Sequence, residues 1–163
     1  MLGELDISIL EILSDDARTP VSALAVMTGA SEDEVKNTLE RLERDRILLK
    51  YPAMVNWDRV RDDRVQALIE VRVTPQRDEG FDAIAAKIYN FEEVKSVYLM
   101  SGAYDLLVIV EGTNIKQLAL FVAEKLSTLE HVLSTATHFV LKKYKQDGVI
   151  MEKVPGDDRL VIS

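Results

Sequence analysis

The chain has 163 residues and no cysteine. This absence excludes disulfides, thiolate metal sites and a cysteine nucleophile. Histidine is scarce as well, because His131 and His138 are the only two. One such pair, with no carboxylates repeated at ligand spacing nearby, makes a poor metal site, and we expect structural or surface roles for both. We therefore predict neither a bound metal nor a cofactor.

Long apolar runs are also missing. No stretch approaches the roughly 18 consecutive apolar residues that a transmembrane helix needs. The N-terminal sequence MLGELDIS is acidic and lacks the basic start and apolar core of a secretion signal. The sequence contains no glycine-rich phosphate loop and no nucleophile elbow, and no known motif places a histidine beside a serine. We expect a cytoplasmic protein that makes no membrane contact and is not an enzyme.

Positive charge is in deficit. The formal net charge is −8, which argues against indiscriminate nucleic-acid binding, since that depends on neutralising phosphates with lysine and arginine. Residues 1–60 hold 12 acids and 7 bases (−5), residues 61–150 hold 13 and 11 (−2), and the rest hold 3 and 2 (−1). The first part of the chain is therefore its most acidic part.

What the chain does contain is a core-forming share of apolar residues, 47%, arranged with clear periods. Residues 4–15 repeat apolar side chains at helical spacing. Thr19-Pro20 then opens a short second helix, and Gly29 suits the left-handed residue at its C-terminal end. Two helices joined by a tight turn, with a first helix to complete the core, are typical of a helix-turn-helix.

The third helix begins with a capping box. Ser31 is a strong N-cap, Glu34 completes the S-x-x-E pattern, and the helix is predicted to run to about Asp45. Its buried stripe is expected to contain Val35, Leu39 and Leu42. Two extended runs over residues 47–51 and 53–55 follow and predict a wing. The sequence thus predicts a winged helix-turn-helix domain over residues 1–56.

The second half predicts an α+β domain. Residues 57–64, WDRVRDDR, carry charge without a core pattern and are interpreted as a hinge or linker. Strand, helix, strand, strand, helix and strand patterns then follow in order, which is the ferredoxin-like βαββαβ arrangement. We assign this domain to residues 65–147 and a C-terminal tail to residues 148–163. The patterns lie at 65–73, 80–90, 94–99, 106–112, 115–126 and 132–141.

Four segments resemble the Lrp/AsnC, or feast/famine, family. They are LDISILEILSDDAR, GASEDEVKNTLERLERDRIL, VNW and SGAYDLLVIVEG. The resemblance implies a transcription regulator with a winged helix-turn-helix and a C-terminal RAM domain that binds effectors and oligomerises. It further implies homodimers, often assembled into octamers, that bind double-stranded DNA and a small effector such as an amino acid. Arg46 stands where the family usually carries glycine, so that turn must be built differently or accept a side chain.

The resemblance gives the third helix a role in DNA contact. Arginine and asparagine can each form two hydrogen bonds to a base, so Lys36, Asn37 and Arg41 are expected to reach base edges or nearby phosphates. Arg44, Arg46 and Lys50 are expected to contact the DNA backbone. The alternative is a solvated amphipathic helix held by pairs such as Glu40 with Arg44.

The turn between the two central strands is the candidate effector site. Its backbone N–H groups, hydroxyl and carboxylate could hold the charged ends of an amino acid once a neighbouring subunit covers them. The alternative is a plain turn in which Asp105 bonds its own backbone. The candidate residues are Met100, Ser101, Gly102, Ala103, Tyr104 and Asp105, with Thr135 and Thr137 on the last strand.

Two other functions stay open at this level. A ligand-binding or scaffold protein that has lost strong DNA contact is supported by the acidic first domain. An enzyme similar to the siroheme decarboxylases is disfavoured, because their histidine-rich haem-facing stretches are missing from this sequence.

Overall fold

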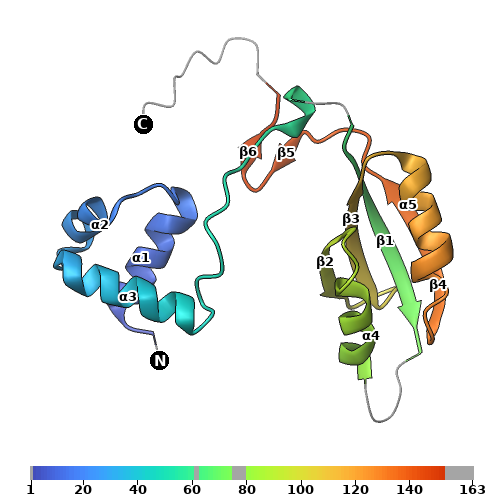
Figure 1. Cartoon of the computed structure of the whole chain (residues 1–163), viewed down its shortest axis with the longest axis horizontal. Coiled ribbons are helices and arrows are strands. Elements are labelled where there is room, and N and C mark those ends of the chain that lie inside the picture. The colour runs from blue at the N-terminus through green and yellow to red at the C-terminus, as the bar shows by residue number, and fades with distance from the viewer. Residues whose placement is uncertain (1, 61–62, 75–79, 153–163) are drawn as a thin grey trace. The chain divides into compact units, whose positions relative to one another are not determined.

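A computed structural model describes residues 2–60, 63–74 and 80–152 (Figure 1). The chain divides into two compact units, residues 1–55 and 56–163. Within the described residues, no helix is both long enough and apolar enough to cross a membrane. Each unit is described below by itself.

The first unit consists of three helices, α1 (Glu4–Asp15), α2 (Val21–Thr28) and α3 (Glu32–Arg44). Their apolar faces meet in one core that contains Ile9, Leu24 and Val35. Gly29 ends α2 with a left-handed φ of 72°, as the sequence predicts. This tight turn connects α2 to α3, so the predicted helix-turn-helix is confirmed.

The capping box of α3 forms as predicted. The Glu34 backbone N–H donates to Ser31 Oγ over 3.3 Å, and the Ser31 N–H donates to Glu34 Oε2 over 2.8 Å. The Ser31 hydroxyl also donates to Glu34 Oε2 over 2.7 Å, and together with the Ser31 backbone N–H it holds the pKa of the Glu34 carboxyl below its usual value. The buried stripe of α3 differs from the predicted one in one position, because Thr38 is buried and Leu39 is only half-buried.

The predicted wing is wrong. Residues 47–56 contain no strand, and the chain between α3 and the short 3₁₀ turn Trp57–Arg59 is irregular. Pro52 lies between the two predicted runs and removes a donor that a ladder would need. The Tyr51 hydroxyl instead donates to Glu43 Oε1 on α3 over 2.6 Å. Extended, partly apolar sequence here serves as a connection between the units.

The second unit is built on a four-stranded antiparallel sheet in the order β2-β3-β1-β4 (Figure 1). The strands are β1 (Val65–Val73), β2 (Val94–Leu99), β3 (Leu106–Gly112) and β4 (Val132–Phe139). Together with α4 (Gly80–Tyr89) and α5 (Ile115–Phe121), they form the predicted ferredoxin-like βαββαβ order. One turn of π-helix, Val122–Leu126, continues α5.

The two faces of the sheet differ. On β1, Ala67, Ile69 and Val71 are fully buried and pack with side chains of both helices. The alternate residues point to the opposite face, where side chains are half-buried, and we call this the open face. Its residues include Leu68, Glu70, Leu107 and Ile109, which are cross-strand neighbours in the register of β1 and β3.

After β4 the chain makes a small hairpin, β5 (Lys145–Gln146) and β6 (Val149–Ile150). Asp147 and Gly148 both have positive φ, 45° and 84°, which a two-residue hairpin turn requires. The predicted start of the tail at residue 148 therefore falls inside this hairpin. The expectation that residues 160–162 pair or fray lies outside the described residues.

Candidate functional site

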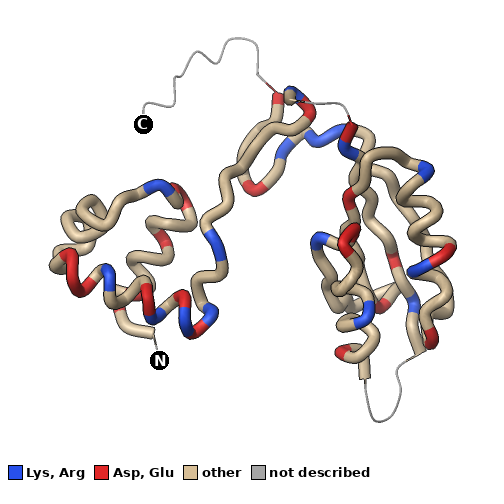
Figure 2. The backbone as a smooth tube through the Cα atoms, viewed as in Figure 1, with Lys and Arg blue, Asp and Glu red and all other residues tan. Residues whose placement is uncertain are grey.

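The outer face of α3 presents three of the six predicted DNA-contact residues. Lys36, Asn37 and Arg44 are exposed on it, with Lys and Arg interleaved among Asp and Glu (Figure 2). Lys36 Nζ lies 3.8 Å from Glu32 and 3.9 Å from Asp33. Exposed pairs of this kind contribute at most about 1 kcal/mol. The cations are therefore held loosely and can exchange these acids for phosphates.

Arg44 forms its ion pair with the neighbouring Asp45, Nε to Oδ1 over 3.7 Å, rather than with Glu40. The ion pair between Glu40 and Arg44, which the alternative to DNA contact predicted, is therefore not formed, and Arg44 pairs with the adjacent residue. Lys50, in the segment after α3, is exposed as well.

Arg41 differs from the other predicted contact residues because it has a partner inside the unit. Its guanidinium forms an ion pair with Asp6 of α1, whose side chain is only 8% exposed. The other Asp6 oxygen accepts the Gly3 backbone N–H over 2.8 Å at the start of α1. Arg41 therefore ties α3 to the first turn of α1. Sequence spacing could not reveal this pair, because the two residues lie on different helices.

Arg46 occupies an unusual backbone position directly after α3. Its φ is +56°, in the left-handed region that favours glycine. The Ile47 N–H donates to the Leu42 carbonyl over 2.9 Å, and the Arg46 N–H donates to that of Glu43 over 3.0 Å. These two bonds are those of a Schellman motif, with Arg46 as its left-handed residue. The turn thus keeps the usual geometry and accepts a side chain, which remains exposed.

The candidate effector turn, residues 100–105, is anchored to β1. The Met100 N–H donates to the Asp105 carbonyl over 2.8 Å, which closes the turn. The Asp105 N–H donates to the Val71 carbonyl over 3.1 Å, and Asp105 Oδ2 accepts the Val73 N–H over 2.9 Å. The carboxylate therefore bonds the neighbouring strand and not its own backbone. Ser101, Gly102 and Ala103 are exposed at the tip, and Tyr104 is half-buried.

Thr135 and Thr137 lie on the other side of β1 from this turn. They pair with Val71 and Ile69, so they belong to the face covered by the helices. The hydroxyls of Thr135 and Ser127 lie 3.1 Å apart, within hydrogen-bond distance. Within one chain, β1 separates the turn from both threonines, and the structure does not bring the two parts of the predicted site together.

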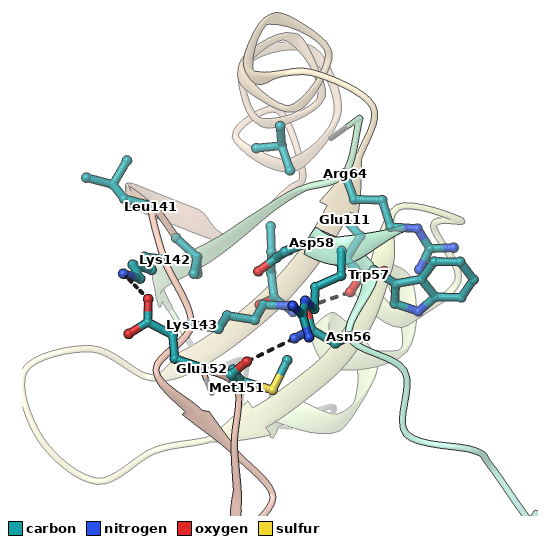
Figure 3. A pocket seen from close by; sticks show the side chains of 14 residues that line it. Asn56, Trp57, Asp58, Arg64, Glu111, Leu141, Lys142, Lys143, Met151 and Glu152 are labelled. Carbon is teal, nitrogen blue, oxygen red and sulfur yellow. Dashed lines mark hydrogen bonds and ion pairs between the residues drawn. The ribbon is translucent and has the colours of Figure 1, made fainter. Parts of the chain in front are cut away.

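A cavity of about 690 Å³ lies at the opposite end of the sheet (Figure 3). Its wall includes Asn56, Trp57 and Arg59, in or beside the segment predicted as a linker, and Lys143 and Met151 from beyond β4. Sequence analysis missed these residues. Charge density in WDRVRDDR was the only signal available, and it indicated a linker equally well.

The described residues contain no group of three or more histidines and acids placed to hold a metal ion. Both histidines have a carboxylate nearby. His138 Nε2 lies 3.3 Å from Glu70 on the open face, and His131 Nε2 lies 3.6 Å from Glu130.

Comparison with known proteins places both units in one family. Residues 2–43 match the AsnC-type helix-turn-helix domain, and residues 66–150 match the Lrp/AsnC ligand binding domain. The YugG protein of Bacillus subtilis, described as an uncharacterized HTH-type transcriptional regulator, is 47% identical over 99% of this chain and 98% of its own length. The transcriptional regulator LysM of Sulfurisphaera tokodaii is 32% identical, over 86% of this chain and 96% of its own.

Solved structures similar to this chain indicate the same family. The transcriptional regulator NMB0573 of Neisseria meningitidis, crystallised as an L-Met complex, superposes with a TM-score of 0.70 at 26% identity, covering 91% of this chain and 96% of that one. AsnC of E. coli gives a TM-score of 0.69 at 25% identity, covering 93% and 99%. The chain therefore belongs to the Lrp/AsnC family of transcriptional regulators, with a helix-turn-helix DNA-binding domain followed by a ligand-binding domain.

Proposed function

We propose that this regulator contacts operator DNA through the outer face of α3 and responds to an amino acid bound at the turn 100–105. The observation that carries the proposal is the outer face of α3, where Lys36 and Asn37 project from a capped helix without a structural role in the core. Lys36 supplies a phosphate contact and Asn37 a base contact. The proposed contacts to the DNA backbone on either side of them are made by Arg44, Arg46 and Lys50.

Arg41 enters this proposal as a residue that positions α3. Its guanidinium is already paired with Asp6, so its removal would weaken DNA binding by loosening the helix. Substitution of Arg41 is consequently a poor test of base recognition. Lys36 and Asn37 give a cleaner test because neither is buried.

The DNA experiment measures retention of genomic fragments by the full chain, first at low salt and then across a salt series. Lys36→Gln with Asn37→Ala should weaken binding at least tenfold, since a good base contact alone is worth about 1–3 kcal/mol and the loss of a phosphate contact weakens binding further. Lys116→Gln on α5 makes the same charge change in the other unit and serves as the control. Equal binding by both variants would remove α3 from the interface. No binding at any salt would favour the ligand-binding or scaffold alternative.

Amino-acid sensing is proposed from the ligand-binding domain and from the L-Met complex of the Neisseria relative. The exposed N–H groups at the tip of the turn can bind a carboxylate, while Asp105 is already used to fix the turn. A thermal-shift series across the amino acids tests this, beginning with L-Met. A ligand at about 100 times its Kd should stabilise the chain by about 2.7 kcal/mol. If none of the amino acids raises the melting temperature, the sensing proposal fails.

Homodimerisation is proposed through the open face of the sheet. Leu68, Leu107 and Ile109 form an apolar strip there, and a second copy related by twofold symmetry would bury it. Leu68→Lys should shift the molecular mass in light scattering toward that of the monomer. Lys116→Gln should leave the mass unchanged. Assembly of dimers into octamers would appear in the same measurement as a larger mass.

A further inference from the structure

The cavity at the start of the second unit has the size of a small-molecule site. Its volume is about 690 Å³, and ligand pockets are typically about 300–1,000 Å³. Segments distant in sequence form its wall: the 3₁₀ turn, the start of β1, the end of β3, residues 140–143 and residues 151–152 (Figure 3). Glu111 of the wall lies on β3, six residues after Asp105 of the predicted effector turn, and six extended residues span about 20 Å. The cavity and the effector turn are therefore separate places.

The side chain of Asn56 gives the first indication that the cavity binds a ligand. Its Nδ2 donates to the Met151 carbonyl over 3.0 Å, and this contact fixes which end of the amide faces Met151. Its Oδ1 is buried and accepts no hydrogen bond within the described residues. A buried acceptor without a donor is unfavourable and rare. The cavity that Asn56 lines can therefore hold a group that donates to this oxygen.

The charged side chains that line the cavity give the second indication of a ligand. Four cations line the cavity against three acids, which leaves one positive charge in a chain whose net charge is −8. The acids are Asp58, Glu111 and Glu152, and the cations are Arg59, Arg64, Lys142 and Lys143.

Two of these cations already have partners. Lys142 pairs with Glu152, and the Arg64 guanidinium lies over the Trp57 ring, 4.0 Å from its centroid. Arg59 and Lys143 form no ion pair within the described part of the chain. The amine of Lys143 points toward the middle of the lining residues (Figure 3). Guanidinium and ammonium groups with free N–H donors bind carboxylate and phosphate oxygens.

We propose that this cavity binds a small organic oxyanion, a carboxylate or a phosphate, that also carries a hydroxyl or amine. The oxyanion is held by Arg59 and Lys143, and the hydroxyl or amine donates to Asn56 Oδ1. Asn56 directly follows Val55, the last residue of the first unit, so a bound ligand orders the segment that joins the two units. Binding does not depend on the DNA contacts proposed above.

The experiment uses calorimetry on the full chain with four probes: citrate, tricarballylate, glycerol 3-phosphate and inorganic phosphate. Tricarballylate matches citrate except for the hydroxyl. We expect citrate or glycerol 3-phosphate to bind. Tricarballylate should then bind more weakly than citrate, and inorganic phosphate more weakly than glycerol 3-phosphate, because neither supplies an alcohol to Asn56 Oδ1. Amide hydrogen exchange over residues 56–60 should slow when the ligand is present.

The variant Arg59→Gln with Lys143→Gln should weaken that binding by about tenfold or more, because it removes two charge-assisted contacts. Lys87→Gln with Lys116→Gln, two exposed lysines on α4 and α5, makes the same charge change elsewhere and should leave the affinity unchanged. The proposal is overturned if neither citrate nor glycerol 3-phosphate binds, or if both double variants bind alike. Loss of DNA affinity in Arg59→Gln with Lys143→Gln, without small-anion binding, would also overturn it and assign these side chains to DNA phosphates.

Discussion

Replacing Arg46 with glycine should make the first unit more stable while removing a cation. Arg46 is the left-handed residue of the Schellman motif after α3, with φ at +56°. Glycine adopts this conformation without a Cβ clash. The two hydrogen bonds of the motif are made by backbone groups, so the substitution leaves both of them in place.

The magnitude follows from two opposing terms. A left-handed conformation costs a residue with a Cβ about 1–2 kcal/mol. Glycine loses more conformational freedom on folding, which costs about 0.5–1 kcal/mol. We expect a net stabilisation of about 0.5–1 kcal/mol. For a unit of residues 1–55, an unfolding entropy of about 2.1 cal/mol/K per residue converts this gain to roughly 4–9 °C in Tm.

The assay is thermal unfolding of the full chain followed by far-UV circular dichroism, with Arg46→Ala as the matched variant. Alanine also removes the charge but keeps the Cβ, so it should show no gain. The proposed DNA contact of Arg46 should be lost equally in both variants. If Arg46→Gly is no more stable than Arg46→Ala, the backbone argument is refuted.

Three further predictions concern single contacts. Asp6→Ala should destabilise the first unit by about 2 kcal/mol, because it removes the carboxylate that accepts from Arg41 and from the Gly3 N–H. In a double-mutant cycle measured by urea denaturation it should couple to Arg41→Ala, and strict additivity would contradict the pairing. Desolvation and the hydrogen bond to Glu43 raise the pKa of Tyr51 from 10.0 to about 12, so the stability that Tyr51 contributes is present below pH 10 and is lost as the pH rises through 12; a tyrosinate absorbance titration of Glu43→Gln should show a lower pKa, and an unchanged pKa would exclude the hydrogen bond as a cause. Asp105→Ala should cost about 1–3 kcal/mol, because the Val73 N–H loses its acceptor, whereas Asp105→Asn keeps an acceptor oxygen and should cost less; equal losses in urea denaturation would point to the charge instead.

The elements of both units could be predicted because each has a clear period and clear ends. The capping box Ser31-Glu34 and the left-handed Gly29 fix the ends of their helices by local chemistry alone. Strict alternation over residues 65–73 gives both the strand and its buried face. The prediction of a wing was wrong because an extended run forms a strand only when a second strand pairs with it. The local pattern of apolar residues does not show whether such pairing occurs, and here Pro52 and the contact of Tyr51 with Glu43 disfavour it.

The candidate sites could be predicted only in part, since side-chain contacts depend on tertiary structure. Helix geometry correctly places Lys36 and Asn37 on the outside of α3. The same geometry groups Arg41 with them, because the partner that draws it inward is Asp6, on another helix. The cavity is harder still to predict, since Asn56 and Met151 on its wall are 95 residues apart in the sequence and are brought together only by the tertiary structure.

The acidity of the first unit affects how the proposed regulator would use DNA. Lys36 must leave Glu32 and Asp33 before it contacts a phosphate, which reduces the net gain of that contact by at most about 1 kcal/mol. The charge of −5 over residues 1–60 also repels DNA at longer range. A single unit should consequently bind weakly at any sequence. Two units tied through the sheets of a dimer bind the second half-site as an intramolecular event, which multiplies affinity without adding positive charge. In this protein, selective binding would therefore depend on oligomerisation more than on the electrostatics of the recognition helix.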